Sequence, residues 1–356
     1  MVNIELLQDT ADLGKLEPVW NTVVETSSSN TCHSTYEWLS TWWKHFSSDK
    51  HLFLLVASEQ GTPVGLAPFY IADDTKTLHF LGQGLSDYAD LIVPRGRGDI
   101  ADQLVAAVVA HHDVWSALDL EEIPEDSPNV QPLDRLRDQQ TGGAWHRTVR
   151  CPYLPIAGSW DEFYQTLGKG FRHEVRNKLN RWDAVHSTGG AGSALQYLDG
   201  DAVDGYLFDE MAALSAERQS ADGHRSPFLN HPDQEFLRDV LPIMGAHGQV
   251  RVGQLRGEGE LLAFMLAFYW QGVVYTWNTQ YKPSYASYSP GRLMLVRFAE
   301  QRFNEGCREL DFMRGEERYK FDWTSHFRTN LALRSGAVAI GTTPSRAEPD
   351  RTNGAC

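Results

Sequence analysis

Two stretches of the chain share one order of apolar and polar positions. Residues 52–58 and 64–71 are largely apolar and enclose a short polar turn that contains glycine. Residues 249–255 and 261–270 enclose a second turn of this kind, which is rich in charge. Apolar runs of this length around a glycine-containing turn predict β-hairpins. We therefore expect one hairpin in each half of the chain.

The residues after each hairpin extend the similarity. A further strand is predicted at Leu78–Leu81 and at Val273–Trp277. A helical pattern follows at Ile100–His111 and at Arg292–Asn304, where Gly306 supplies a typical stop. Two strands, a third strand and a helix in the same order indicate a duplicated unit, although this order is also common in unrelated α+β proteins.

These patterns predict an α+β fold of two domains, each a twisted mixed sheet flanked by helices. A chain of 356 residues is long enough for two hydrophobic cores. We place the domains at 1–150 and 151–341, because a stretch with Pro and Gly follows Cys151. Residues 342–356 contain almost nothing apolar, so we expect a disordered tail.

Charge and cysteine usage narrow the functional classes. The formal net charge is −15, which disfavours broad binding of a polyanion, so we expect no DNA partner. The four cysteines are far apart and do not have the spacing of a metal site; they are Cys32, Cys151, Cys307 and Cys356. We expect free thiols in a reducing compartment and no bound metal.

The N-terminal residues lack the basic and apolar regions of a signal peptide. No apolar run reaches the 18 residues of a membrane-spanning helix. The sequence therefore predicts a cytoplasmic protein without an integral membrane segment.

The most informative segment is 309–323. A short apolar strand runs into five charged residues between Arg314 and Lys320, and Tyr319 and Trp323 lie among or just behind them. Such a segment is either a solvated turn or part of a substrate pocket. Because a strand, a glycine-containing turn and a helix precede it, the pocket becomes the more attractive interpretation.

Lys169–Trp182 is a locally basic segment in an acidic protein. At helical spacing its apolar residues form one stripe, and Lys169, Arg172 and Arg176 form a face beside that stripe. This pattern is typical of a surface helix with an apolar underside. It also fits a helix that borders a cleft and binds phosphate or carboxylate through its guanidinium groups.

Two glycine-containing turns complete the candidate sites. Ser289-Pro290-Gly291 has the composition of a helix start, with Ser at the N-cap and Pro in the first turn, and such a start can also bind an anion. The loop from Gly82 to Asp90 is either an ordinary turn or a means of placing Asp87 and Tyr88 in a cleft between the domains.

With these residues described, the chain resembles the CelD/BcsL-like branch of the GNAT acyltransferase superfamily, which is related to the FemAB aminoacyltransferases. The resemblance covers about residues 15–336. Four motifs carry it: Gly82-x-Gly84-x-x-Asp87-Tyr88-x-Asp90, Phe171-Arg172-x-x-x-Arg176-x-x-x-x-Arg181, Ser289-Pro290-Gly291 with Leu293-Met294-Leu295, and Gly306-x-x-x-Leu310-Asp311-Phe312-x-x-Gly315-x-Glu317-x-Tyr319-Lys320.

The resemblance implies two GNAT-like domains with a cleft between them, and transfer of an acyl group from acyl-CoA, either acetyl-CoA or a longer thioester. The donor loop implied is Ser289, Pro290, Gly291 and Arg292. The superfamily signature carries a further Gly or Ala where this chain has Leu293, so aminoacyl-tRNA remains an alternative donor.

The same resemblance implies roles for the charged segment. Aminolysis of a thioester needs a proton acceptor, for which Asp311 or Glu317 is suitable, and a group that stabilises the oxyanion, for which Lys320 is suitable. Tyr319 could return a proton to the leaving thiolate. The substrate-binding residues that we expect are Asp87, Tyr88, Arg172, Arg176, Trp277 and Arg314.

The resemblance thus implies an acyltransferase that acts on an amine, or less readily a hydroxyl, of a carbohydrate or small metabolite. Two alternatives stay open. One is aminoacyl transfer from tRNA to a cell-wall precursor or metabolite, and the other is a binding protein that kept the fold without the chemistry.

Overall fold

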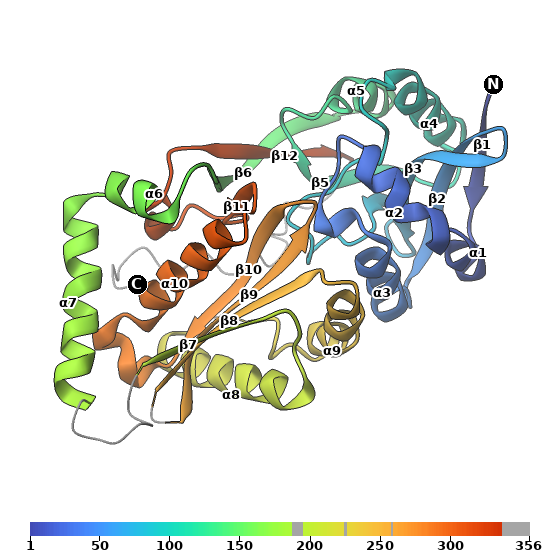
Figure 1. Cartoon of the computed structure of the whole chain (residues 1–356). Helices are drawn as coiled ribbons and strands as arrows, with labels where there is room; N and C mark the ends of the chain where they lie inside the picture. Colours follow the sequence, from blue (N-terminus) through green and yellow to red (C-terminus); the bar gives the residue numbers. More distant parts are fainter. Residues whose placement is uncertain (187–194, 224–225, 258, 337–356) are drawn as a thin grey trace. The chain divides into compact units, whose positions relative to one another are not determined.

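The computed structural model describes residues 1–186, 195–223, 226–257 and 259–336 (Figure 1). The chain forms two compact units that divide between Arg150 and Cys151, and residues 328–336 belong to the first unit. Each unit is a mixed sheet with helices, which confirms the predicted α+β class. The tail expected to be disordered, 342–356, lies outside the described residues.

The first unit contains a sheet in the order β1-β2-β3-β4-β5-β12. Neighbouring strands are antiparallel except β4 and β5, which are parallel. The strands are β1 (Val2–Leu7), β2 (Lys50–Glu59), β3 (Thr62–Ala72), β4 (Thr77–Phe80), β5 (Ala117–Pro124) and β12 (Phe327–Ser335).

Helices cover the sheet of the first unit. They are α1 (Thr10–Lys15), α2 (Glu17–Thr26), α3 (Tyr36–Phe46), α4 (Gly98–Ala110) and α5 (Val130–Gln139), with a 3₁₀ turn η1 (Cys32–Ser34). The apolar side of α4, with Ile100 and Leu104 fully buried, packs with Phe53 and Phe69 of the sheet. A Cβ on Gly65 would lie 2.7 Å from Ile100, so glycine allows α4 to approach β3 closely.

The second unit repeats this plan, in the order β6-β11-β10-β9-β8-β7. Its parallel pair is β10 and β11, and its other described pairs are antiparallel. The strands are the part of β6 (Ala144–Pro155) from Cys151 onward, β7 (Gln196–Gly200), β8 (Val250–Gly257), β9 (Glu260–Trp270), β10 (Val273–Tyr281) and β11 (Glu309–Asp311). The helices are α6 (Trp160–Thr166), α7 (Lys169–His186), α8 (Gly205–Asp222), α9 (His231–Ala246) and α10 (Pro290–Asn304), with 3₁₀ turns η2 (Pro283–Tyr288) and η3 (Arg318–Asp322).

The two units therefore share one topology. In each, a hairpin leads to a third antiparallel strand, and a helix then leads to a strand parallel to the third. The predicted hairpins and the two helices after them are present. One assignment differs from the sequence-based expectation, which gave residues up to 341 to the second domain. Residues 328–336 group with the first unit because β12 pairs with β5.

The sheet of the second unit is covered on both faces. On one face, Met265 of β9 and Val274 of β10 belong to a core that also contains Phe298 of α10. On the other face, the ring of Phe264 meets Phe228, which in turn meets Phe208 of α8. Helices α10 and α8 lie on opposite sides of this sheet (Figure 1), and successive side chains of a strand alternate between the two faces. None of the helices that the structure describes is long and apolar enough to cross a membrane.

Candidate active site

The backbone pairing between the parallel strands β10 and β11 ends at Tyr275 and Asp311. They are paired from Val273 with Glu309 to Tyr275 with Asp311, after which β10 continues to Tyr281 paired with β9. The pairing of β10 with β9 shifts register between Thr276 and Asn278, which marks a β-bulge. A bulge beside separated strands leaves backbone groups of β10 available to a bound molecule.

The strands lead into α10, whose N-terminus carries no side-chain cap. Ser289 occupies the N-cap position with φ of 51°, a left-handed conformation, and its side chain makes no capping hydrogen bond. The predicted position of the helix start is confirmed, but the expected capping by the Ser289 hydroxyl is not seen. The first-turn N–H groups, with the positive end of the helix dipole, are suited to an anion.

The end of α10 also matches its prediction. Gly306 has φ of 70°, and its N–H donates to the carbonyl of Phe303 while the N–H of Cys307 donates to that of Arg302. This pair of bonds is a Schellman motif, which requires a residue that tolerates the left-handed region.

The basic helix α7 packs against η2, the turn that enters α10. Nζ of Lys178 donates to the carbonyl oxygen of Ser287 at 2.8 Å, and the guanidinium of Arg181 lies 5.3 Å from the ring centre of Tyr288. Trp182, which is buried, contacts the rings of Tyr285 and Tyr288. The predicted apolar stripe of this helix is therefore real, and two of its cations lie beside the predicted donor loop.

Arg292, a predicted donor-loop residue, forms ion pairs with residues of α7 and η3. Its guanidinium donates to the carboxylate of Glu174 on α7 and lies 3.5 Å from that of Asp322. It also lies over the ring of Phe171 at 5.2 Å. These contacts join α10 to α7, so in this structure the side chain of Arg292 positions the helix start.

Arg172 and Arg176, the predicted anion-binding pair, gather near Tyr164 of α6 and Arg297 of α10. Burial raises the pKa of Tyr164, and the positive charges of Arg172, Arg176 and Arg297 oppose that rise. Arg172 donates to the side chain of Gln165. Lys178 and Arg181 contact Ser287 and Tyr288, just before the predicted donor loop, and substrate binding by Arg172 and Arg176 remains a prediction.

The charged segment after β11 is held in place by contacts between its own residues. The carboxylate of Asp311, a predicted proton acceptor, accepts the N–H of Met313 at 2.7 Å and is 1% exposed. Lys320, which is 4% exposed, donates from Nζ to the carbonyl oxygens of Met313, Arg314 and Gly315 at 3.3, 2.8 and 3.4 Å. Its ammonium also lies 2.9 Å from the carboxylate of Glu317. Lys320 therefore stabilises the conformation of the loop at 313–317.

The other predicted residues of the second unit lie near these elements. Tyr319 is half-buried and packs against the core beside α10. Trp277, at the bulge, is buried with its ring 5.7 Å from that of Phe268 on the α8 side of the sheet. Glu317 has 30% of its side chain exposed, although its Oε2 is buried beside the ammonium of Lys320.

Asp87 and Tyr88 belong to the first unit and are buried there. The N–H of Asp87 donates to Nδ1 of His33 at 3.2 Å, and its carbonyl accepts from the side chain of Asn330 at 2.8 Å. The motif around them is anchored by Asp90, which accepts hydrogen bonds from the Leu91 N–H and the Ser127 hydroxyl. These contacts organise a loop, and the predicted substrate contact of Asp87 and Tyr88 remains a prediction.

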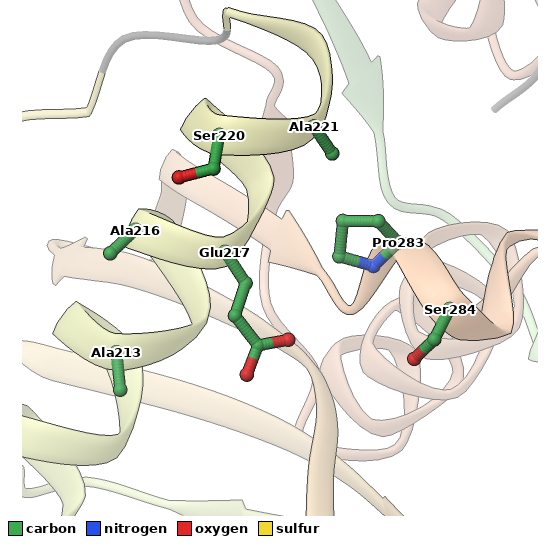
Figure 2. Close-up of a pocket in the computed structure, with 7 residues that line it drawn as sticks. All are labelled: Ala213, Ala216, Glu217, Ser220, Ala221, Pro283 and Ser284. Carbon is green, nitrogen blue, oxygen red and sulfur yellow. The ribbon is translucent and has the colours of Figure 1, made fainter.

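An open pocket of about 670 Å³ lies between α8 and η2 (Figure 2). Most of its α8 side chains are small, and Glu217 projects between the helix and the turn. The lining residues are Ala213, Ala216, Glu217, Ser220, Ala221, Pro283 and Ser284. The pocket is open to solvent over most of its extent, so it is a shallow hollow of the surface. Within the described chain, no group of three or more His, Cys, Asp or Glu is arranged to hold a metal ion.

Comparison with protein-family models gives a match within the second unit. Residues 169–321 match the family model described as "Acetyltransferase (GNAT) domain". The match begins at α7 and ends within η3, so it contains the parted strands, α10 and the Lys320 loop. A search of curated proteins gave no significant match.

Solved structures share the fold over nearly the whole chain. FemX is 11% identical, with 93% of this chain and 96% of FemX aligned at a TM-score of 0.64. A C-terminal domain from Agrobacterium fabrum, assigned to a lysylphosphatidylglycerol synthetase, is 12% identical, with 92% and 93% aligned at a TM-score of 0.56. A conserved protein of unknown function from Bacteroides thetaiotaomicron is 13% identical, with 94% and 99% aligned at a TM-score of 0.53. At these identities the similarity concerns the fold.

Proposed function

We propose that the protein is an acyltransferase that moves an acyl group from acyl-CoA to an amine, or less readily a hydroxyl, of a carbohydrate or small metabolite. The observation that carries this proposal is the coincidence of three features within residues 169–321. Those features are the parted strands β10 and β11, the uncapped start of α10, and the match to a GNAT domain.

The donor would lie along these features. The pyrophosphate of acyl-CoA carries the charge that the first-turn N–H groups of α10 attract. Lys178 and Arg181, which already touch η2, would add cationic contacts. The thioester would then extend toward the bulge of β10, where exposed backbone groups can hydrogen-bond to it.

The transfer step needs a proton acceptor, a proton donor and a loop that positions both. The acceptor nitrogen attacks the thioester carbonyl carbon, loses a proton, and displaces the CoA thiolate, which takes up a proton. We assign proton acceptance, directly or through water, to Glu317, because the carboxylate of Asp311 is committed to the Met313 N–H. Tyr319 would supply the proton to the thiolate, and Lys320 would hold the loop that presents both.

Calorimetry with acetyl-CoA tests the donor assignment. We expect binding with a shallow dependence on salt, since a compact pyrophosphate engages few cations. Gly291→Val should weaken binding because a branched side chain hinders approach to the helix start. Gly291→Ala is the matched control, because its Cβ would lie 3.5 Å from the ring of Tyr281, an ordinary contact.

Two results would overturn the donor assignment. The first is normal acetyl-CoA binding by Gly291→Val, and the second is transfer supported by charged tRNA alone, with a steep salt dependence. The second result would establish the aminoacyl-tRNA alternative. Absence of binding to either donor would favour a binding protein without transferase activity.

A further inference from the structure

Two carboxamide side chains are buried on the α8 side of β10. Asn278 lies opposite Leu266, and Gln280 lies opposite Phe264, in the register of β10 with β9. Phe264 contacts Phe228, so this face is the one that α8 and its neighbours cover. Asn278 is 8% exposed and Gln280 is 0% exposed.

Their polar atoms are left without partners in the described part of the chain. Neither Nε2 nor Oε1 of Gln280 has a hydrogen-bond partner, and Oδ1 of Asn278 has none. Buried polar groups in folded proteins are nearly always paired, so an unpaired carboxamide indicates that a partner is supplied from outside the chain. Two such side chains two residues apart point to one shared partner.

Their neighbourhood connects them with the candidate active site. Asn278 adjoins the bulge, where β10 has already separated from β11. Gln280 lies three residues before Pro283, which lines the pocket between α8 and η2 (Figure 2).

The chemistry of a carboxamide defines the ligand. It carries donors and an acceptor but no charge, so it pairs with hydroxyl or amide groups and offers nothing specific to an ion. Resting on the proposed acyl transfer, we infer that Asn278 and Gln280 recognise the acceptor, and that this acceptor is a neutral, hydroxyl- or amide-bearing framework around the reacting amine.

Saturation-transfer NMR on the full-length protein with bound CoA tests the inference. The probes are glucosamine and cyclohexylamine, two six-membered-ring amines with and without hydroxyl groups. We expect transfer to glucosamine and none to cyclohexylamine. Gln280→Leu and Asn278→Leu should each weaken glucosamine binding roughly tenfold, as expected for loss of a buried hydrogen bond.

Thr279→Val is the matched control. Thr279 is the intervening residue of the same strand, and its hydroxyl meets the sulfur of Met265 on the opposite face. This variant should keep glucosamine binding. A Leu at position 280 should also leave the melting temperature equal to or above that of the wild type, since no hydrogen bond within the protein is lost.

Each remaining outcome decides against the inference. Equal signals from both amines, no signal from either, or unchanged binding by Gln280→Leu would overturn it. A lower melting temperature for Gln280→Leu would show that the carboxamide serves the fold, for instance through buried water. Acetyl-CoA calorimetry on the same variants prepared without CoA separates this failure from failure of the proposed function, because the donor binds the α10 start, which these variants leave intact.

Discussion

Gly257 and Trp182 are in direct contact at the end of β8. A Cβ on Gly257 would lie 2.4 Å from Cζ2 of the Trp182 indole, closer than any real contact allows. Trp182 is 1% exposed and also meets the rings of Tyr285 and Tyr288. The absence of a side chain at Gly257 therefore fixes how α7 approaches the turn before α10.

The first prediction follows from this contact. Gly257→Ala should displace Trp182 and lower the free energy of unfolding by about 1–3 kcal/mol, the usual effect of overpacking. Acetyl-CoA affinity should fall as well, because α7 carries Lys178 and Arg181 to the donor loop. Denaturant unfolding and calorimetry would measure the two effects.

Gly170→Ala provides the control on the same helix. A Cβ there would meet nothing within 4 Å, so this variant should be at least as stable as the wild type, since Ala favours helix more than Gly. Equal stabilities of the two variants would contradict the packing argument.

The second prediction concerns Lys320. From sequence alone its removal would affect turnover and leave stability unchanged, but the structure shows a buried ammonium bonded to three carbonyls of its own loop. Lys320→Met should therefore lower the free energy of unfolding by about 2–4 kcal/mol, as expected when a buried charged partner is lost. Turnover should fall with it, because the loop that carries Glu317 and Tyr319 loosens.

Thermal unfolding and initial rates on the same preparation would check this role. Arg318→Ala is the control, because Arg318 is an exposed cation two residues away. A variant of Lys320 with an unchanged melting temperature and a loss of about 10²-fold or more in turnover would instead place the ammonium at the reacting centre.

The fold could be predicted largely because its signals are local. The hairpin at 52–71, the helix stop at Gly306 and the apolar stripe of α7 each depend on residues close together in sequence. The partner strand of β12 could not be predicted in this way. Pairing of β12 with β5 joins Leu333 to Leu120, residues separated by most of the chain.

The candidate site was harder to predict than the fold. The sequence identified a basic helix and a charged loop, but it did not distinguish which cations turn toward α10. Arg172 and Arg176 turn toward Tyr164, whereas Lys178 lies against Ser287, because the direction of each side chain depends on how α7 packs. The carboxamide of Gln280 gave no signal, since only burial makes its unpaired state visible.

The third prediction separates these two groups of cations. Replacing both Lys178 and Arg181 by Gln should raise the KM for acyl-CoA about tenfold with little change in kcat, as expected for lost uniform binding. Replacing both Arg172 and Arg176 by Gln should leave that KM within a factor of about two, since neither contacts the donor loop. Steady-state kinetics at fixed acceptor would measure both. The reverse order of effects would restore the sequence-based assignment.

The fourth prediction concerns the pH dependence of stability in the first unit. Burial raises the pKa of the Asp90 carboxyl from 3.8 to about 6, although hydrogen bonds from Ser127 and the Leu91 N–H oppose the rise. The folded state thus holds this proton more tightly than the unfolded state. The contribution of Asp90 is fully present below about pH 4 and is lost as pH rises through about 6, by about 3 kcal/mol in total.

Asp90→Asn tests this dependence because an amide does not titrate and can still accept the Leu91 N–H. Urea unfolding of both proteins from pH 4.5 to 7.5 would give the difference in their free energies of unfolding, in which the other carboxylates largely cancel. We expect the wild type to lose stability relative to Asp90→Asn as pH rises across this range, with most of the change complete near pH 7. A difference that is constant with pH, or one that changes in favour of the wild type, would show that Asp90 is ionised in the folded protein and that its hydrogen bonds outweigh the cost of burial.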